Sequence, residues 1–289
     1  MNGRLRGTVT AVAAFLLLVV VWELAKWLLP AAGVTVGDTR ILPRTDDAAM
    51  PHVWTVLAKL GDPEVAGAAD PRTVGAAVAA GALFTLGLSL GGLVLGGIGG
   101  TLLALLMQRF ALAEKAVLPY VIASQTVPLI AIAPLVAGWG GKIAIAGWTW
   151  QPWASVMVIA SYLAFFPISV GMLRGLTSPR KADVEMFHSL AAGWWRTLLR
   201  LRLPASVPHL LPAVRLAAAA AVVGAIVAEI STGTRGGIGR LIIEYAQSAT
   251  GDPSQMYAAI LGAAVLGLVA AGLVGVLELG LGRYRGATS

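Results

Sequence analysis

The sequence predicts an all-α, polytopic membrane protein with six transmembrane helices, and three observations support this fold class. Of the 289 residues, 57% are hydrophobic and 12% are charged, whereas soluble domains are about 45–50% apolar and about 25% charged. The apolar residues gather in runs of about 20, the length that crosses a hydrocarbon core about 30 Å thick. Most of the 21 Lys and Arg residues fall in segments that six crossings place on one side, as the positive-inside rule requires. We therefore predict a multi-pass protein of the inner (plasma) membrane with both termini in the cytoplasm.

Composition excludes several function classes. The chain has no cysteine, so disulfides and cysteine-based metal or redox sites are excluded. Its three histidines lie far apart and no HExxH pattern occurs, so we predict no metal site. The net charge of +7 is the bias expected of the cytoplasmic loops of a membrane protein. We therefore predict no nucleic-acid partner.

The apolar runs and the loops between them give the predicted topology. The spans are predicted at residues 8–29, within 74–107, and at 117–139, 153–173, 210–229 and 256–281. An external loop covers 30–73 and includes a short amphipathic helix at 53–60. The stretch 74–107 is too long for one straight crossing, so we expect a surface segment followed by one tilted helix. A strongly charged internal segment, 174–209, joins the fourth and fifth spans.

Glycine and proline positions predict where helices pack closely and where they break. Gly92, Gly96 and Gly100 recur every four residues, and a row of small residues on one helix face favours close packing of helices in lipid. Pro128 and Pro134 both fall within the span at 117–139. A proline inside the membrane frees a backbone carbonyl. The outcome is either a simple kink or a broken backbone that lines a translocation path.

The internal segment 174–209 has its own predicted structure. Its pattern predicts a short helix, a turn, a second basic amphipathic helix and then a proline stop. Asp183 and Glu185 suit the positive N-terminal end of the first helix. Pro204 and Pro208 are expected to prevent one continuous helix into the fifth span. The residues alone fit either a rigid surface for a soluble partner or an amphipathic helix that lies on lipid.

The same segment resembles the EAA loop of ABC importer permeases, in the branch that includes nitrate, sulfonate and taurine systems. Glu185 takes the glutamate position, Ser189 and Leu190 match the S-L pair, and Leu203-Pro204 match the L-P that ends the loop. Further matches in order along the chain are Ile41-Leu42-Pro43, Val127-Pro128 to Pro134-Leu135, Phe165-Phe166-Pro167, Trp195, Ala228-Glu229 and Gly236-Gly237-Ile238-Gly239. Together they cover about residues 41 to 285.

The sequence departs from the family pattern in the loop itself. Met186 and Phe187 stand where the motif has two alanines, and Ala191 stands where it has glycine. Glycine permits a left-handed turn that alanine disfavours, so we expect Gly193 to carry the turn instead. The stretch Ala144 to Pro152 resembles an insertion relative to the family.

The resemblance implies a type I ABC importer fold, in which a cytoplasmic coupling helix lies at about 183–191. It implies a permease subunit that is not an enzyme and binds no cofactor, because Mg-ATP is held by a partner. The sequence has no GxxxxGK[ST] motif, in agreement with a separate ATPase. The implied partners are a dimer of ABC ATPase subunits, an extracytoplasmic substrate-binding protein, a second permease copy in a homodimer, and membrane lipid. The implied ATPase-coupling residues are Asp183, Glu185, Ser189, Leu190, Ala191, Gly193, Leu203 and Pro204.

The resemblance also suggests domains and a pathway. We expect an N-terminal span and external loop at 1–73, and a core permease domain at 74–285 with the coupling loop at 174–209. Pro128, Pro134 and Glu229 are candidate pathway or gate residues. For Glu229, a hydrogen bond to the glycine-rich turn after the fifth span is the favoured interpretation, and a gate is the other.

The implied substrate is a small solute. The branch handles sulfonates, taurine and nitrate, or heterocycles such as thiamine precursors and riboflavin. Two other classes stay open: an ion-coupled secondary transporter, which would need intramembrane acids, and a membrane enzyme, which would need a cluster of catalytic side chains.

Overall fold

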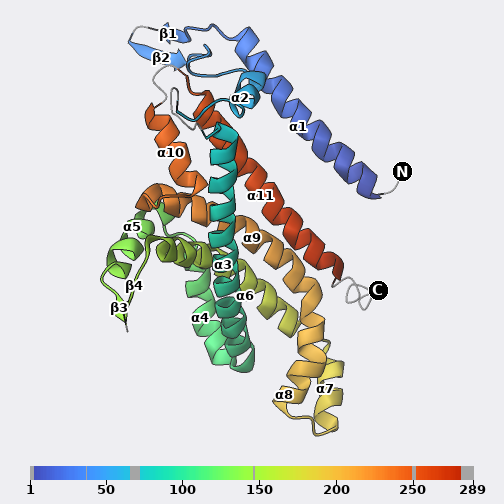
Figure 1. Cartoon of the computed structure of the whole chain (residues 1–289). Helices are drawn as coiled ribbons and strands as arrows, with labels where there is room; N and C mark the ends of the chain where they lie inside the picture. Colours follow the sequence, from blue (N-terminus) through green and yellow to red (C-terminus); the bar gives the residue numbers. More distant parts are fainter. Residues whose placement is uncertain (1–2, 37, 66–71, 146, 249–251, 281–289) are drawn as a thin grey trace. The chain divides into compact units, whose positions relative to one another are not determined.

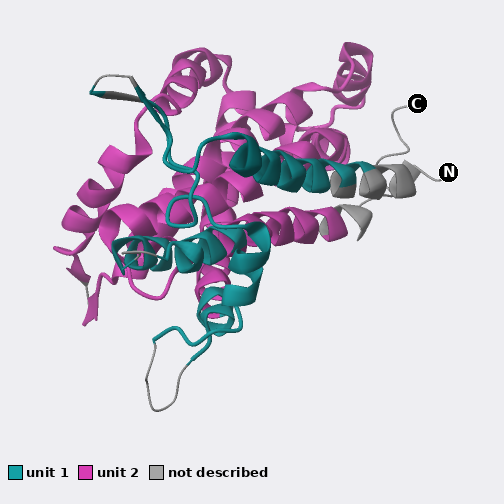
Figure 2. Cartoon of the chain, turned by 90° about the horizontal axis from the view of Figure 1, so that it is seen from above, with its two compact units in different colours: residues 1–79, 241–261 teal, residues 80–240, 262–289 magenta. Residues whose placement is uncertain are grey.

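A computed structural model of the chain describes residues 3–36, 38–65, 72–145, 147–248 and 252–280. It divides into two compact units (Figure 2). Unit 1 comprises Met1–Ala79 and Leu241–Leu261, and unit 2 comprises Ala80–Arg240 and Gly262–Ser289. These units are defined by contacts within the chain, and the domain boundary expected at residue 73 stays a prediction.

The described chain is largely helical (Figure 1). In chain order, the helices are α1 (Gly3–Leu28), α2 (Val53–Lys59), α3 (Val74–Arg109), α4 (Ala111–Ser124), α5 (Leu129–Gly140), α6 (Pro152–Thr177), α7 (Lys181–Ser189), α8 (Trp194–Thr197), the π-helix η1 (Leu198–Arg202), α9 (Leu203–Thr232), α10 (Ile238–Ser248) and α11 (Ser254–Gly280). Two small antiparallel hairpins pair β1 (Val34–Val36) with β2 (Thr39–Leu42), and β3 (Ala144–Ile145) with β4 (Trp148–Thr149). The hairpin β3–β4 lies in the predicted insertion.

Length and hydropathy identify the candidate membrane spans. Within the described ranges, four helical stretches are long and apolar enough to cross: Val74–Arg109, Pro152–Thr177, Trp194–Thr232 and Ser254–Val276. The pair α4 and α5 passes the same test together. The predicted first span forms helix α1, whose place in the membrane stays a prediction. The all-α, polytopic membrane fold class is confirmed.

Helix α3 differs from its prediction, because it is one continuous helix of 36 residues. The expected surface segment before a tilted helix is wrong. From residue 74 to 108 the sequence has no proline and no charged residue, so nothing in it ends the helix. At about 1.5 Å per residue the helix is about 54 Å long.

The glycine row of α3 is a packing face, as predicted. A Cβ added at Gly92 would lie 2.5 Å from the Cβ of Ala160, and one added at Gly96 would lie 2.5 Å from the carbonyl oxygen of Ser161. At Gly100, the added Cβ would lie 2.8 Å from the Phe165 carbonyl. Larger side chains would therefore push α3 away from α6.

The predicted third span is broken. Helices α4 and α5 meet at 101°, so a single span over 117–139 is wrong as a continuous helix. Pro128 is the N-cap of α5, and its missing N–H frees the carbonyl of Ser124, four residues earlier. The hydroxyl of Tyr162 on α6 donates a hydrogen bond to that carbonyl. The backbone is thus broken and not merely kinked, and a side chain from another helix satisfies the freed group. That this break lines a translocation path stays a prediction.

The core of unit 2 is built on close contact between α6 and α9. Alanines fill the contact, and five of them are almost completely buried: Ala160, Ala164, Ala217, Ala221 and Ala225. At Gly175 an added Cβ would lie 2.6 Å from the Cα of Ser206. Such small residues let two helix backbones approach closely, and dispersion contacts then hold the pair together.

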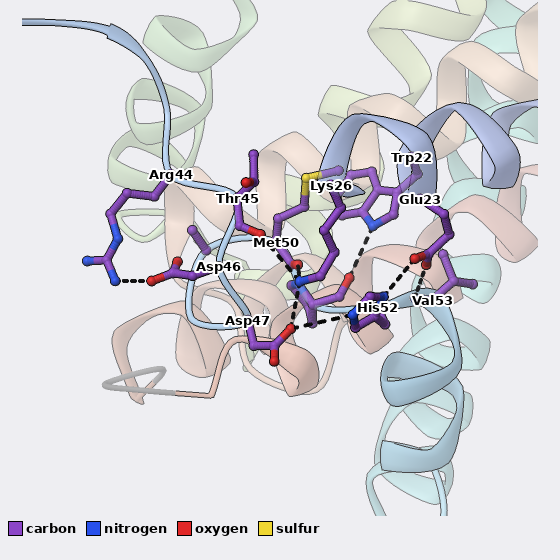
Figure 3. Close-up of polar contacts among 12 residues, drawn as sticks. Trp22, Glu23, Lys26, Arg44, Thr45, Asp46, Asp47, Met50, His52 and Val53 are labelled. Carbon is purple, nitrogen blue, oxygen red and sulfur yellow. Dashed lines mark hydrogen bonds and ion pairs between the residues drawn. The ribbon is translucent and has the colours of Figure 1, made fainter. Parts of the chain in front are cut away.

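Unit 1 contains a network of charged side chains between α1 and the loop before α2 (Figure 3). The Lys26 ammonium lies 2.6 Å from the Asp47 carboxylate. The Glu23 carboxylate accepts a hydrogen bond of 2.9 Å from the backbone N–H of Val53, the first residue of α2. The other Glu23 oxygen lies 2.7 Å from the His52 ring. These contacts tie the end of α1 to the loop.

Candidate functional site

Helix α7 occupies the predicted coupling position between α6 and α8. None of its nine residues is buried. Asp183 lies in its first turn, where a negative charge is favoured, and Arg180 donates to its carboxylate at 2.9 and 3.0 Å. These hydrogen bonds hold the pKa of Asp183 below its ordinary value. The helix is held by its ends and leaves its sides open to a partner.

The turn after α7 is formed by Ala191 and not by Gly193. Ala191 has φ +51°, and it is the one non-glycine residue with positive φ in the described chain. Its N–H donates to the His188 carbonyl, and the N–H of Ala192 donates to the Phe187 carbonyl, both at 2.9 Å. This is the Schellman pattern that closes a helix end. Gly193 has φ −66° and ψ 165°, so the expectation that it carries the left-handed turn is wrong.

Neither Pro204 nor Pro208 stops the helix. The chain is helical without interruption from Trp194 to Thr232, with Pro204 in the first turn of α9, where a missing N–H is tolerated. Just before it, η1 forms a wider π turn, in which the N–H of Leu203 bonds to the Leu198 carbonyl. π turns are uncommon and concentrate at functional sites. The expected proline stop is therefore wrong, because the wider turn accommodates the proline.

The coupling surface is defined here as Glu185, Met186, Ser189, Leu190 and Trp195. All five are exposed. Three are large apolar residues, with Met186 53%, Leu190 70% and Trp195 68% exposed. Apolar side chains beside a carboxylate form a surface of mixed chemistry that suits a protein partner.

The segment that follows α7 is packed against α6. Arg202 donates a hydrogen bond of 2.9 Å to the carbonyl of Leu176, near the end of α6. Thr197 and Leu198 are buried at 4% and 2% exposure, and Leu198 packs in the cluster that includes Leu176. These contacts pack the segment that follows α7 against the end of α6.

Glu229 lies at the opposite end of α9 and is fully buried. One oxygen accepts a hydrogen bond of 2.8 Å from the Thr85 hydroxyl on α3, and the other accepts one of 2.9 Å from the Gly239 N–H on α10. The Thr85 hydroxyl in turn accepts from the Ile238 N–H at 3.0 Å. A Cβ added at Gly237 would collide with the Glu229 carboxylate. We call Thr85, Glu229, Gly237, Ile238 and Gly239 the carboxylate clasp.

The clasp confirms the predicted hydrogen bond between Glu229 and the glycine-rich turn. The partners that the structure gives Glu229 come from α3 and α10, whereas Pro128 and Pro134 lie exposed around and within α5. The three candidate pathway residues are thus not joined in one described cluster, and a pathway or gate role for any of them stays a prediction.

Sequence reasoning missed two partners of these sites. Thr85 is one of the few hydroxyl residues in the apolar helix α3, and an isolated polar residue in such a helix signals a partner. Tyr162, which satisfies the break at Pro128, lies among apolar residues of α6 in the same way. In the insertion, Trp150 donates a hydrogen bond of 2.7 Å to the Ser155 hydroxyl, which fixes the hairpin β3–β4 against the start of α6.

Comparison with known proteins identifies a family profile and several relatives that match this sequence. The sequence profile of the family described as "binding-protein-dependent transport system inner membrane component" matches residues 92–283. The formylaminopyrimidine transport permease protein ThiX of Halalkalibacterium halodurans is 32% identical over 215 residues, which are 74% of this chain and 72% of the relative. The riboflavin transport system permease protein RibX of Chloroflexus aurantiacus is 32% identical over 60% of each chain.

A third relative and a solved structure agree. The putative aliphatic sulfonates transport permease protein SsuC of Bacillus subtilis is 27% identical over 56% of this chain and 54% of its own length. The crystal structure of a bacterial ABC transporter involved in the import of the acidic polysaccharide alginate matches with a TM-score of 0.54 and 20% identity, over 73% of this chain and 80% of that one. This last likeness concerns the fold alone. The chain belongs to the family of binding-protein-dependent transport system inner membrane components, the permease subunits of ABC importers.

Proposed function

We propose that this chain forms the translocation pathway of an ATP-driven importer and that α7 with its flanking turn is where a separate ATPase docks. The observation that carries the proposal is the coupling surface. It projects from the bundle between two spans, buries none of the α7 side chains and exposes Met186 and Leu190 beside Glu185.

The connection behind the surface supports a mechanical role. When the ATPase dimer closes on ATP, it would carry α7 with it, and the buried contacts of Leu198 and the Arg202 hydrogen bond would pass the movement to α6 and α9. Packed interfaces transmit such displacements because they do not compress. The chain would itself hold no nucleotide, and Mg-ATP would stay on the partner.

Purification in mild detergent tests this docking. The tagged chain is isolated from its native host, and co-eluting proteins are identified by mass spectrometry. We expect a stoichiometric P-loop ATPase with the unsubstituted chain. The double variant Glu185→Lys/Leu190→Lys should lose it, because the variant places two positive charges in an apolar and acidic contact.

The matched control is Leu112→Lys/Glu114→Lys, which makes the same two substitutions at the start of α4, where Leu112 is 81% exposed. It should retain the ATPase, and both variants should insert in the membrane at equal levels. A homogeneous preparation that contains no ATPase would overturn the proposal and favour the ion-coupled alternative.

The proposed cargo is a small organic solute, either a nitrogen heterocycle or a sulfonate, delivered by an extracytoplasmic binding protein to a pair of permease copies. The relatives named for formylaminopyrimidine, riboflavin and aliphatic sulfonates support this range. Uptake of each compound by proteoliposomes with the co-purified ATPase and binding protein would identify the cargo. Transport of none of them would contradict the proposed range.

A further inference from the structure

A groove between α6 and α9 is not used by the coupling surface or by the carboxylate clasp. It has a volume of about 450 Å³. Its lining residues from α6 and α9 are Phe166, Pro167, Val170, Gly171, Arg174, Pro208, His209, Pro212, Ala213 and Leu216. All of them belong to unit 2, and the groove lies between two helices that are apolar enough to span the membrane.

The groove has a basic end and an apolar end. Arg174 on α6 and His209 on α9 are exposed and lie toward the ends of their helices that connect to α7 and α8. Pro167 precedes Arg174 by seven residues, or about 10 Å along a helix, so the apolar end lies deeper. No acidic side chain lines the groove. Neither the Arg174 guanidinium nor the His209 ring forms a hydrogen bond or ion pair with the residues whose placement is described.

We propose that this groove binds one anionic phospholipid from the leaflet nearest α7, with its phosphate at Arg174 and His209 and an acyl chain along Pro167, Pro212 and Leu216. Arginine pairs with phosphate through two parallel hydrogen bonds. Basic pockets between transmembrane helices favour anionic headgroups. The proposal rests on the membrane placement of α6 and α9 and not on the proposed import function, so the two can fail separately.

A lipid in this position would act on the contact between α6 and α9. A Cβ added at Gly171 would collide with that of Ala213, so α6 and α9 are in close contact at these two residues of the groove lining. A lipid seated there would bridge the two helices that carry the coupling segment. Anionic lipid would therefore stiffen the route from α7 to the bundle.

A single fluorescent label tests the proposal, because the chain has no cysteine to compete for the label. Val170→Cys places a bimane in the groove of the full chain, reconstituted in nanodiscs. Quenching is compared between brominated phosphatidylglycerol and brominated phosphatidylcholine at equal mole fraction. We expect about fivefold stronger apparent binding of the anionic lipid, the ratio that corresponds to about 1 kcal/mol for one basic residue near the surface.

Two controls separate this site from general attraction of anionic lipid. Adding Arg174→Gln and His209→Gln should abolish the preference, whereas Arg196→Gln with Arg200→Gln, which remove exposed charges from α8 and η1, should leave it. A bimane at Leu102→Cys, in an apolar groove without cations, should be quenched equally by both lipids.

Two outcomes would overturn the proposal without any charge substitution. One is equal quenching of the Val170→Cys label by the two lipids. The other is a label protected from both lipids, together with disulfide formation between unlabelled Val170→Cys chains under a mild oxidant such as copper phenanthroline, which would mean that a second copy of the chain fills the groove.

Discussion

At one end of α9, Glu229 is completely enclosed, and its two oxygens accept hydrogen bonds from the Thr85 hydroxyl and the Gly239 N–H. Ahead of its other end, beyond α8 and η1, Glu185 on α7 and Leu190 at the C-cap of α7 lie exposed, and α7 buries none of its residues. Both ends carry a carboxylate and a family-like motif, yet one is satisfied within the chain and the other is open.

The difference separates a motif that serves folding from one that we propose serves a partner. A buried carboxylate is tolerated only when hydrogen bonds replace its hydration, so the clasp must be complete in the isolated chain. An exposed carboxylate is hydrated already, and the role proposed for its motif needs a second protein. Substitutions at the clasp should therefore destabilise the chain itself, whereas substitutions at the coupling surface should change binding and leave stability alone.

The largest expected change in stability follows from adding a methyl group inside the carboxylate clasp. Gly237→Ala puts a methyl group where the Glu229 carboxylate lies, so the carboxylate must move and lose its hydrogen bonds. We expect a loss of about 3 kcal/mol in the free energy of unfolding, measured by denaturation in mixed detergent micelles.

The control for this change is Gly87→Ala, in α3 of the same unit, where an added Cβ meets nothing within 4 Å. It should leave stability unchanged or raise it slightly, since alanine favours helix more than glycine does. Equal destabilisation by both variants would contradict the close approach at Gly237.

A smaller loss is expected from Thr85→Val, which keeps the shape of the side chain and removes its hydroxyl. Glu229 then loses a donor and the Ile238 N–H loses its acceptor. We expect a loss of about 2 kcal/mol in the free energy of unfolding.

Thr177→Val is the matched control for Thr85→Val. Among the residues whose placement is described, the Thr177 hydroxyl bonds only to carbonyls within its own helix, and Thr177 lies exposed at the end of α6. Its loss should change stability by less than about 0.5 kcal/mol. A Thr85→Val protein as stable as this control would mean that water or another group replaces the hydroxyl.

Much of this contrast could be predicted from the sequence. The residues concerned, which are long apolar runs, glycines and a carboxylate in an apolar helix, each allow few structural environments. The apolar runs predicted α6, α9 and α11, and the glycine row predicted the face of α3 that meets α6. Glu229 beside a glycine-rich turn predicted the hydrogen bond that the clasp contains. In each case one local pattern agrees with the global packing.

The sequence-based predictions failed where two conformational preferences of similar energy competed. A preference for glycine at positive φ pointed to Gly193, but the two backbone hydrogen bonds that close α7 favour Ala191 in that conformation despite its cost. A rule that proline ends helices pointed to a stop at Pro204, but a π turn in η1 accommodates the ring. The partner roles of Thr85 and Tyr162 depend on contacts between distant helices, which no local pattern contains.

The left-handed Ala191 gives a prediction at the coupling end. Ala191→Gly removes the strain of a Cβ at φ +51° and should raise the free energy of unfolding by about 1 kcal/mol, since left-handed alanine costs about 1–2 kcal/mol and glycine loses part of this gain to chain entropy. Gly193→Ala is the control, because an added Cβ meets nothing within 4 Å there. If Gly193→Ala were the destabilising change, the turn would lie where the sequence placed it.

The smallest effect is expected from Asp183→Asn, which removes the exposed ion pair with Arg180. Hydrogen bonds from Arg180 hold the pKa of Asp183 below its ordinary value of 3.8, so any stability that the pair adds is present above that pH and is lost as the pH falls through the lowered pKa. Between pH 5 and 8 the variant should therefore unfold like the unsubstituted chain, because water screens the pair. Glu229→Gln, also a carboxylate-to-amide change, should cost about 1–2 kcal/mol because an amide offers only one acceptor oxygen to the clasp. Equal losses from the two variants would mean that the coupling end is built into the fold as firmly as the clasp, and its exposed motif would then no longer indicate a partner.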